Sequence, residues 1–288
     1  MENKTSVQRM HDYNSKCTVM GIKKFDFDYF EEEDEVFVTR IYISDNETER
    51  TVRIPSFVSW VDYSAWHDNS QLKNCLIYIP KGCRIMFHSE DTTALRYFGH
   101  CANAIFVEED HADYVSENGV LFNKEKTVLL AYPAGKTEEN YTIPDSVIKI
   151  ENGAFFEHKY LKTLHISQNV LEIKNCQFWG FTRIEVDVEN TMYRSINSSL
   201  YSKDGKIAYH LYAHRSGNVK IEEGTVLVKE MYLTGDFEEL YLPESLKPIG
   251  GLEALLEDIR GGYEQIVAPK SLKDYLGAFE GVYEISYY

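Results

Sequence analysis

The stretch from Tyr141 to Val186 decides the fold, and its sequence is YTIPDSVIKIENGAFFEHKYLKTLHISQNVLEIKNCQFWGFTRIEV. Its second half repeats the first at a step of 23 residues, and four of five template positions keep their apolar character. The matched pairs are Ile143/Ile166, Val147/Val170, Ile150/Ile173, Ala154/Gln177 and Phe155/Phe178. A fixed period of this length is typical of a solenoid, in which one short unit is stacked on copies of itself.

The repetition has an energetic reason. Burying five apolar side chains contributes roughly 8–15 kcal/mol. Ordering the backbone of such a unit costs more than that, because each residue costs ~1–2 kcal/mol. A single unit is therefore expected to stay unfolded, whereas stacked units share their apolar faces and their backbone hydrogen bonds. Such an array needs a cap at each end.

Further copies of the template lie on both sides of this stretch. They start at Ile54, Ile79, Ile221, Leu242 and Ala268, and they keep its spacing in whole or in part. A proline follows the first residue in several copies and ends the strand there, because proline lacks a backbone donor. Counting strand ends predicts about nine rungs, each a strand with its following turn. The strands end at residues 54, 79, 107, 143, 166, 186, 221, 242 and 268.

A second internal repeat has an offset of 79 residues. The first copy contains Ile105, Tyr114, Ser116, Asn118 and Leu121, and the second contains Ile184, Tyr193, Ser195, Asn197 and Leu200. Each copy leads into a polar turn and then a second apolar strand, Val128–Tyr132 or Ile207–Tyr212. We interpret both as β-hairpins inserted between rungs, at about residues 112–135 and 190–215.

The N-terminal residues 1–48 do not fit the repeat. In the predicted capping hairpin, the strand Val36–Ile43 turns back through Asp45-Asn46-Glu47 into Thr51–Ile54. Seven of the ten residues from Asp26 to Glu35 are acidic, which favours a solvated and partly mobile segment. Docking of a basic partner and calcium binding are the alternatives for this segment, although the EF-hand spacing is absent.

The repeat array is predicted to cover residues 49–280. Within it, apolar residues from Leu252 to Ile259 share one face at helical spacing, and Gly261-Gly262 would end this helix. The tail, residues 281–288, is aromatic and alternating. We expect it to be the C-terminal cap, with an exposed sticky tail as the alternative.

Composition limits the class of protein. The 288 residues are 43% hydrophobic and 14% aromatic, which is typical of a folded chain. The apolar runs are too short for a transmembrane helix, and the first 20 residues lack a secretory signal pattern, so we expect a cytoplasmic protein. A net charge of −16 argues against nucleic acid and favours a basic partner. The odd number of scattered cysteines predicts reduced thiols; they are Cys17, Cys75, Cys83, Cys101 and Cys176.

The signals for catalysis or metal binding are weak. Gly135-Lys136-Thr137 resembles the end of a phosphate loop, but Leu130 stands where that loop needs glycine. His210 and His214 have a metal-ligand spacing for a helix, whereas the local pattern is a strand. Cys101 follows a histidine, yet adjacent strand residues point to opposite faces. We therefore predict a non-enzymatic protein without metal or cofactor.

The motif Ile143-Pro144…Val147…Ile150…Ala154-Phe155 resembles the BspA-like leucine-rich repeats of bacteria. So does the inserted unit from Tyr114 to Pro133. The likeness covers roughly residues 50–280. It implies a right-handed arc of α/β repeats with a parallel sheet on the concave side and short helical turns on the convex side. It also implies a binding role, often at the surface of host-associated or gut bacteria, without catalytic residues.

Each rung strand has one residue that must point away from the core, between two inward apolar neighbours. Stacked rungs would place these residues in a ladder along the concave face. They are Arg53, Tyr78, Phe106, Thr142, His165, Glu185, Lys220 and Tyr241. Such a mixture of aromatic and charged residues supplies anchors for a protein or glycan ligand. The alternative is that they are ordinary strand residues on a solvated or covered face.

We therefore expect a monomeric protein-interaction module that binds a protein or a glycan on its concave face, and the negative charge favours a basic protein. It would neither bind nucleic acid nor insert into a membrane. One rival is a carbohydrate or small-ligand site between an inserted hairpin and the sheet, with hydrolytic activity if two carboxylates lie close together. Another rival, implied by the resemblance, is a fragment of an extracellular adhesin or glycan-binding surface protein.

Overall fold

The computed structural model describes residues 5–19, 24–43, 50–62, 64–67, 72–85, 98–174, 178, 180–212, 217–229, 233–234, 237–247, 265–279 and 281–288. The chain forms two compact units. The first unit comprises residues 1–137 and 149–160, and the second comprises residues 138–148 and 161–288. Several predicted features lie outside the described residues, namely the turn Asp45-Asn46-Glu47, Cys176, His214 and the helix from Leu252 to Ile259.

The architecture is a parallel β-solenoid, with few helices among the described residues, as the 23-residue period predicts. It has about eight turns, so the prediction of nine rungs was slightly wrong. The error arises because we counted strand ends as rungs. A complete turn runs from one strand to the next, and nine ends therefore bound one turn fewer.

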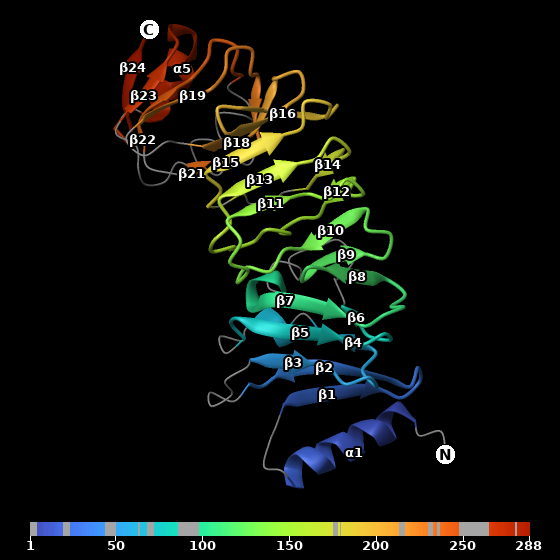
Figure 1. The fold of residues 1–288 in the computed structure, drawn as a ribbon. Helices are drawn as coiled ribbons and strands as arrows, with labels where there is room; N and C mark the ends of the chain where they lie inside the picture. The colour runs from blue at the N-terminus through green and yellow to red at the C-terminus, as the bar shows by residue number, and fades with distance from the viewer. Residues whose placement is uncertain are drawn as a thin grey trace. The chain divides into compact units, whose positions relative to one another are not determined.

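The first unit begins with helix α1 (Ser6–Val19), which is drawn beside strand β1 in Figure 1. One sheet of this unit has the order β1-β2-β4-β6. Its strands are β1 (Phe25–Phe30), β2 (Glu35–Ile41), β4 (Trp60–Val61) and β6 (Arg84–Ile85). A second sheet, with the order β3-β5-β7, is parallel throughout. Its strands are β3 (Thr51–Arg53), β5 (Cys75–Ile79) and β7 (Ala102–Val107). The short helix α2 (Ser64–His67) follows β4.

An antiparallel meander follows β7 and joins the next turn. Strands β8, β9 and β10 pair in chain order, and β10 then pairs in parallel with β12. Their bounds are Tyr114–Glu117 for β8, Val120–Asn123 for β9, Val128–Ala131 for β10 and Lys149–Ile150 for β12. The predicted first hairpin is thus confirmed, and its last strand doubles as part of the solenoid.

The second unit repeats this plan. Strands β11 (Asn140–Thr142), β13 (Thr163–Ile166) and β15 (Arg183–Val186) form one parallel sheet. The meander β16-β17-β18 follows, and β18 pairs in parallel with β20 and β21. The bounds are Tyr193–Ile196 for β16, Ser199–Ser202 for β17, Ile207–Tyr212 for β18, Leu227–Val228 for β20 and Leu233–Thr234 for β21; β14 is Glu172–Ile173.

The last sheet of the second unit has the order β19-β22-β23-β24 and is parallel. Its strands are β19 (Gly217–Lys220), β22 (Phe237–Tyr241), β23 (Gln265–Ala268) and β24 (Glu284–Tyr287). Short helical segments separate the last two strands, namely η2 (Lys270–Leu272), α5 (Lys273–Leu276) and η3 (Gly277–Phe279). The aromatic tail therefore supplies the final strand of this sheet, at the position where we expected a cap.

A single turn type ends the strands of the parallel sheets and explains the template. In the first unit, the carbonyl of Pro55 accepts a hydrogen bond from the N–H of Val58 at 3.0 Å. In the second unit, the carbonyl of Pro144 accepts from Val147 at 2.9 Å. The turn Ser167–Val170 forms the same bond without proline. The apolar residue four positions after the last residue of the strand is thereby turned inward, where it is buried. It is Val58, Val147 or Val170 in these three turns.

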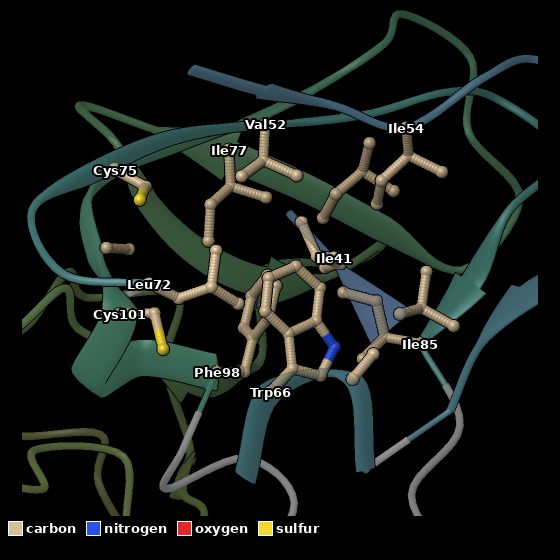
Figure 2. Close-up of a cluster of buried hydrophobic side chains, with 14 of the residues drawn as sticks. Ile41, Val52, Ile54, Trp66, Leu72, Cys75, Ile77, Ile85, Phe98 and Cys101 are labelled. Carbon is tan, nitrogen blue, oxygen red and sulfur yellow. The ribbon is translucent and has the colours of Figure 1, made fainter. Parts of the chain in front are cut away.

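Inward residues from successive strands form a buried hydrophobic cluster in each unit. In the first unit Val52 and Ile77, from neighbouring strands, point to the same side, and Ile54 lies beside them (Figure 2). The rings of Trp66 and Phe98 meet edge to face, with their centroids 4.9 Å apart. All five side chains are at most 5% exposed, so the apolar residues predicted to point inward are buried.

The N-terminal cap differs from the prediction. Strand β2 pairs antiparallel with β1 through the acidic turn Glu31–Asp34, whereas β3 pairs in parallel with β5. The acidic segment is therefore partly an ordered strand. Its aromatic residues explain this difference, because Phe25 is buried and Phe27 packs against the core while Asp26 and Asp28 alternate with them. The acidic charges dominated the sequence pattern and hid this alternation.

The 79-residue repeat has a physical role at the edge of β7. In a continuous ladder, backbone N–H groups on this edge would donate to the next strand. Instead, the N–H of Ile105 donates to the carbonyl of Gly119 at 2.9 Å, and the N–H of Val107 donates to Ser116 Oγ at 3.0 Å. The inserted hairpin therefore satisfies the donors that the missing strand would have bonded.

The second unit makes both bonds at equivalent positions on β15. The N–H of Ile184 donates to the carbonyl of Ser198 at 3.1 Å, and the N–H of Val186 donates to Ser195 Oγ at 3.2 Å. The repeated sequence thus encodes a repeated edge contact.

A buried histidine fixes the start of the first hairpin. His111 lies four residues after the strand end at residue 107, where most other turns carry an apolar residue, and it is 1% exposed. Its Nδ1 accepts hydrogen bonds from the N–H groups of Asp113 at 3.0 Å and Tyr114 at 3.2 Å. Its Nε2 lies 2.8 Å from the carbonyl of Cys83, to which it donates. One side chain thus bonds the hairpin to the preceding turn.

Asn190 makes the equivalent connection in the second unit and is fully buried. Its Oδ1 accepts from the N–H groups of Met192 at 2.9 Å and Tyr193 at 2.8 Å. Its Nδ2 donates to the carbonyls of Ser167 and Val170, both at 2.9 Å. At both points where a hairpin is inserted, a buried polar side chain four residues after the strand end thus bonds the hairpin to a neighbouring turn.

We predict that Asn190→Leu lowers the free energy of unfolding by about 2–4 kcal/mol, because buried backbone groups lose their partners while the volume is kept. Urea denaturation followed by circular dichroism measures this change. The control is Asn169→Leu, since the exposed Asn169 donates to the carbonyl of Asp145 at 2.8 Å and water can replace it. It should change the stability by about 0.5 kcal/mol or less. Equal losses in both variants would contradict the role assigned to Asn190.

Candidate functional site

The predicted outward residues lie in register within each parallel sheet. Arg53, Tyr78 and Phe106 are consecutive partners on β3, β5 and β7, and we call them the first column. Thr142, His165 and Glu185 are consecutive partners on β11, β13 and β15, and form the second column. Lys220 and Tyr241 are partners on β19 and β22, and form the third column. The placement follows from alternation, since each residue is flanked by at least one buried neighbour.

The first column is a continuous stack of side chains in the first unit. The guanidinium carbon of Arg53 lies 3.7 Å from the centroid of the Tyr78 ring. The rings of Tyr78 and Phe106 are stacked, with centroids 4.8 Å apart and planes 20° apart. Phe106 is nevertheless 38% exposed. The column therefore presents an aromatic surface whose side chains are already ordered.

The second column is polar and internally paired. His165 Nδ1 lies 2.7 Å from Glu185 Oε2, and the guanidinium of Arg183 contacts the other carboxylate oxygen of Glu185. The side chains of His165 and Glu185 are 39% and 35% exposed. The parallel register places these polar side chains side by side, and solvent reaches them.

The third column consists of a lysine and a tyrosine whose hydroxyl is hydrogen-bonded. Tyr241 donates to Glu239 Oε2 at 2.9 Å, and Asn218 Nδ2 donates to the same oxygen at 2.6 Å. The hydrogen bond to Glu239, and then burial, raise the pKa of Tyr241 above its ordinary value. Lys220, its partner on β19, is exposed.

A hollow of about 510 Å³ lies in the second unit, and sequence reasoning did not identify its residues as a set. Its lining comes from β11, β13 and β15 and from the β16–β17 hairpin with β18. The lining residues used below are Glu139, Lys162, Arg183, Glu185, Asn197 and Ser198. The signal that could have found it is the 79-residue offset, because Arg183 and Ser198 stand where the first copy has Ala104 and Gly119.

The charges of this lining are compensated within it. Lys162 Nζ lies 2.6 Å from Glu139 Oε1, and Glu185 is held by Arg183 and His165. Each carboxylate named here therefore has a cationic partner. The condition set above for hydrolytic activity was two close carboxylates, and the two carboxylates named here are each ion-paired.

The family comparison agrees with the repeats described above. Residues 134–224 match the family described as BspA type leucine rich repeat region, in six copies. Residues 134–224 are thus similar to BspA-type leucine-rich repeats. The matched segment includes the central stretch with which the sequence argument began, and the BspA-like resemblance is thereby confirmed.

Three solved structures are similar to this chain. A leucine-rich repeat protein from Eubacterium ventriosum is 20% identical, covers 67% of this chain and 57% of its own length, and has a TM-score of 0.37. The pneumococcal vaccine antigen PcpA is 14% identical, with 88% and 84% covered and a TM-score of 0.41. A leucine rich cell surface protein from Faecalibacterium prausnitzii is 15% identical, with 68% and 54% covered and a TM-score of 0.37.

The chain thus spans little more than half the length of two of these proteins. The comparison with curated proteins gave no match. Among the described helices, none is both long enough and apolar enough to cross a membrane.

The weak catalytic candidates do not assemble into a reactive site in the described part of the repeat protein. Cys101 is buried, and burial raises the pKa of its thiol to about 12, so it is not the nucleophilic thiolate. The neighbouring His100 contacts Glu157 instead, at 2.9 Å. Lys136, in the loop that resembled a phosphate loop, donates from Nζ to the carbonyl of Asn118 at 2.8 Å.

His210 is a core residue of the repeat protein. It is 1% exposed, and its ring meets that of Phe178 edge to face at 5.9 Å. Burial lowers the pKa of His210 to about 4, while a hydrogen bond with the Phe178 backbone acts in the opposite direction. Groups of three or more metal-binding side chains are absent from the described residues.

We predict that His210 makes the stability of the protein depend on pH. The pKa is about 4 in the folded chain and 6.5 in the unfolded chain, so the unfolded state binds the proton first. Above pH 6.5 His210 does not change the free energy of unfolding. As the pH falls toward 4, it lowers this free energy by up to about 3 kcal/mol. His210→Leu should remove this component, measured as the difference between variant and wild-type unfolding free energies from pH 7 to 4.

The control for this experiment is His11→Leu on α1, where the side chain is exposed in the folded chain. The same pH dependence in wild type and His210→Leu would show that His210 does not contribute.

Proposed function

We propose that the chain is a non-enzymatic interaction module, which binds a macromolecular partner through the outward faces of its parallel sheets. The observation that supports this most strongly is the first column, in which Arg53, Tyr78 and Phe106 form one accessible stack. Arginine and tyrosine are among the residues enriched at the energetic centres of interfaces. The match to BspA-type repeats supports an interaction role at the level of the family.

The order of the stack reduces the cost of binding. Immobilising a flexible side chain at an interface costs about 0.5–1.5 kcal/mol. Tyr78 and Phe106 are already constrained by the 4.8 Å stacking and by strand register. A partner would therefore gain contact area on this column without ordering it first.

The partner is proposed to be a protein, and the charge of −16 favours a basic one. Long-range attraction to such a partner raises the association rate more than the final affinity, and salt should reduce it. The columns also carry Arg53, His165 and Lys220, so the local contact surface is mixed in charge.

We predict that the triple variant Tyr78→Ala/Phe106→Ala/Tyr241→Ala weakens partner binding by tenfold or more, because it removes aromatic anchors from two columns. Candidate partners are first identified by crosslinking the full chain in native cells, and affinities are then measured with purified proteins. The control is Phe30→Ala/Tyr160→Ala, which removes exposed aromatic residues outside the columns. Unchanged binding in the triple variant defeats the proposal.

The BspA-type match also supports a second proposal, that the module acts at a cell surface. This proposal predicts that protease added to intact native cells cleaves the protein before the membrane is broken. Immunoblotting of treated cells measures the cleavage, with a known cytosolic protein as the control. Full protection until lysis would exclude a surface location.

A further inference from the structure

In both copies of the 79-residue repeat the hairpin turn has the same backbone conformation, but the second residue of the turn differs. In the first copy, Asn118 and Gly119 have φ values of 50° and 78° and form the turn between β8 and β9. In the second, Asn197 and Ser198 have φ values of 49° and 66° between β16 and β17. Two consecutive left-handed residues are what a tight hairpin turn requires, and glycine suits the second position best. Ser198 departs from that preference.

In the first copy the turn lies close against the sheet. A β-carbon added to Gly119 would lie 2.9 Å from the Cβ of Ala104 on β7. Glycine and alanine are therefore the pair that allows hairpin and strand to touch. This close approach leaves no room for a larger side chain at position 119.

In the second copy the same two positions carry Arg183 and Ser198. Both residues line the hollow of about 510 Å³, together with Asn197 on the turn and Glu185 on the strand. The hairpin still bonds to the strand, through the N–H of Ile184 and the carbonyl of Ser198. The larger residues thus line a space beside this bond, and Ser198 keeps a left-handed conformation that favours glycine.

The chemistry of the lining is suited to hydroxyl groups. The guanidinium of Arg183 donates hydrogen bonds, the carboxylate of Glu185 accepts them, and the amide of Asn197 does both. These side chains are held by other contacts, since Arg183 contacts Glu185 and Asn197 Nδ2 donates to Glu222 at 3.2 Å. The volume lies within the range of about 300–1,000 Å³ that is usual for small-ligand sites.

The charges favour a neutral ligand over an ion. The cations Lys162 and Arg183 are paired with Glu139 and Glu185, so the lining has no uncompensated charge among these residues. The chain as a whole has a net charge of −16 and repels polyanions at long range. A ligand that alternates donors and acceptors without carrying charge fits both observations.

We propose that the hollow binds a neutral saccharide, whose hydroxyl groups bond to Arg183, Glu185, Asn197 and Ser198. Tyr212, also in the lining, supplies an aromatic residue for the apolar face of a sugar ring. This site shares Glu185 with the surface proposed above for a protein partner and extends from it to the β16–β17 hairpin. Its test needs no protein partner, so either proposal can fail alone.

The test begins with the full chain on an array of neutral, sialylated and sulfated oligosaccharides. Isothermal titration then gives Kd for the soluble neutral di- or trisaccharide with the strongest signal. The key variant is Arg183→Ala/Ser198→Gly, which rebuilds the pair found at Ala104 and Gly119. The matched control is Arg194→Ala, which removes the same charge from β16 at a residue that does not line the hollow.

The proposal predicts binding of at least one neutral saccharide, a Kd raised at least tenfold in the double variant and an unchanged Kd in Arg194→Ala. Ser198→Gly alone should raise Kd several-fold while leaving Tm unchanged or higher, since glycine suits the left-handed position. A residue with a purely structural role would not separate these two readouts. The single variant also provides the test if the double variant does not fold.

Three outcomes overturn the proposal. The first is that no neutral saccharide binds. The second is that only sialylated or sulfated sugars bind, which would indicate recognition of charge. The third is that the double variant, folded by circular dichroism, binds as tightly as the wild-type chain.

Discussion

The structure depends on the hydrogen bonds that each turn of the chain makes with the next. The N–H of Ile54 donates to the carbonyl of Tyr78 at 3.1 Å, and in the second unit the N–H of Ile143 donates to His165 at 2.9 Å. A short unit cannot compensate the entropy of ordering its own backbone. Sharing donors and acceptors with its neighbours makes the array stable, and the same bonds fix the register that aligns the outward side chains.

Much of this fold could be predicted because the constraints are local and repeated. Burial of one side of each strand requires apolar and polar residues to alternate. The turn formed by the four residues after the strand end also recurs from one parallel strand to the next. The N-terminal region was predicted less well, since Phe25 and Phe27 alternate with Asp26 and Asp28 in a strand that belongs to no repeat. Where a pattern occurs once, the sequence offers no second copy with which to recognise it.

The candidate site, too, was predicted only where its residues follow a repeated pattern. The columns follow from alternation and register, so Arg53, Tyr78 and Phe106 could be placed without coordinates. Their stacking at 3.7 and 4.8 Å depends on rotamers and could not be predicted. A ligand site between an inserted hairpin and the sheet was among the alternatives, but the residues of the hollow were missed, because similarity between the copies was used to find the hairpins. Its residues are the ones at which those copies differ.

The bonds from Ser116 and Ser195 to the preceding strands have a wider consequence. An unpaired strand edge invites association with other chains. Here each hairpin accepts hydrogen bonds from backbone N–H groups on the edge of a parallel sheet. The sheet can therefore end within the protein without leaving these donors unpaired. Rungs could then be gained or lost between two such stops during evolution without creating a surface that aggregates. The inserted hairpins would in this way set the units by which proteins of this kind change their length.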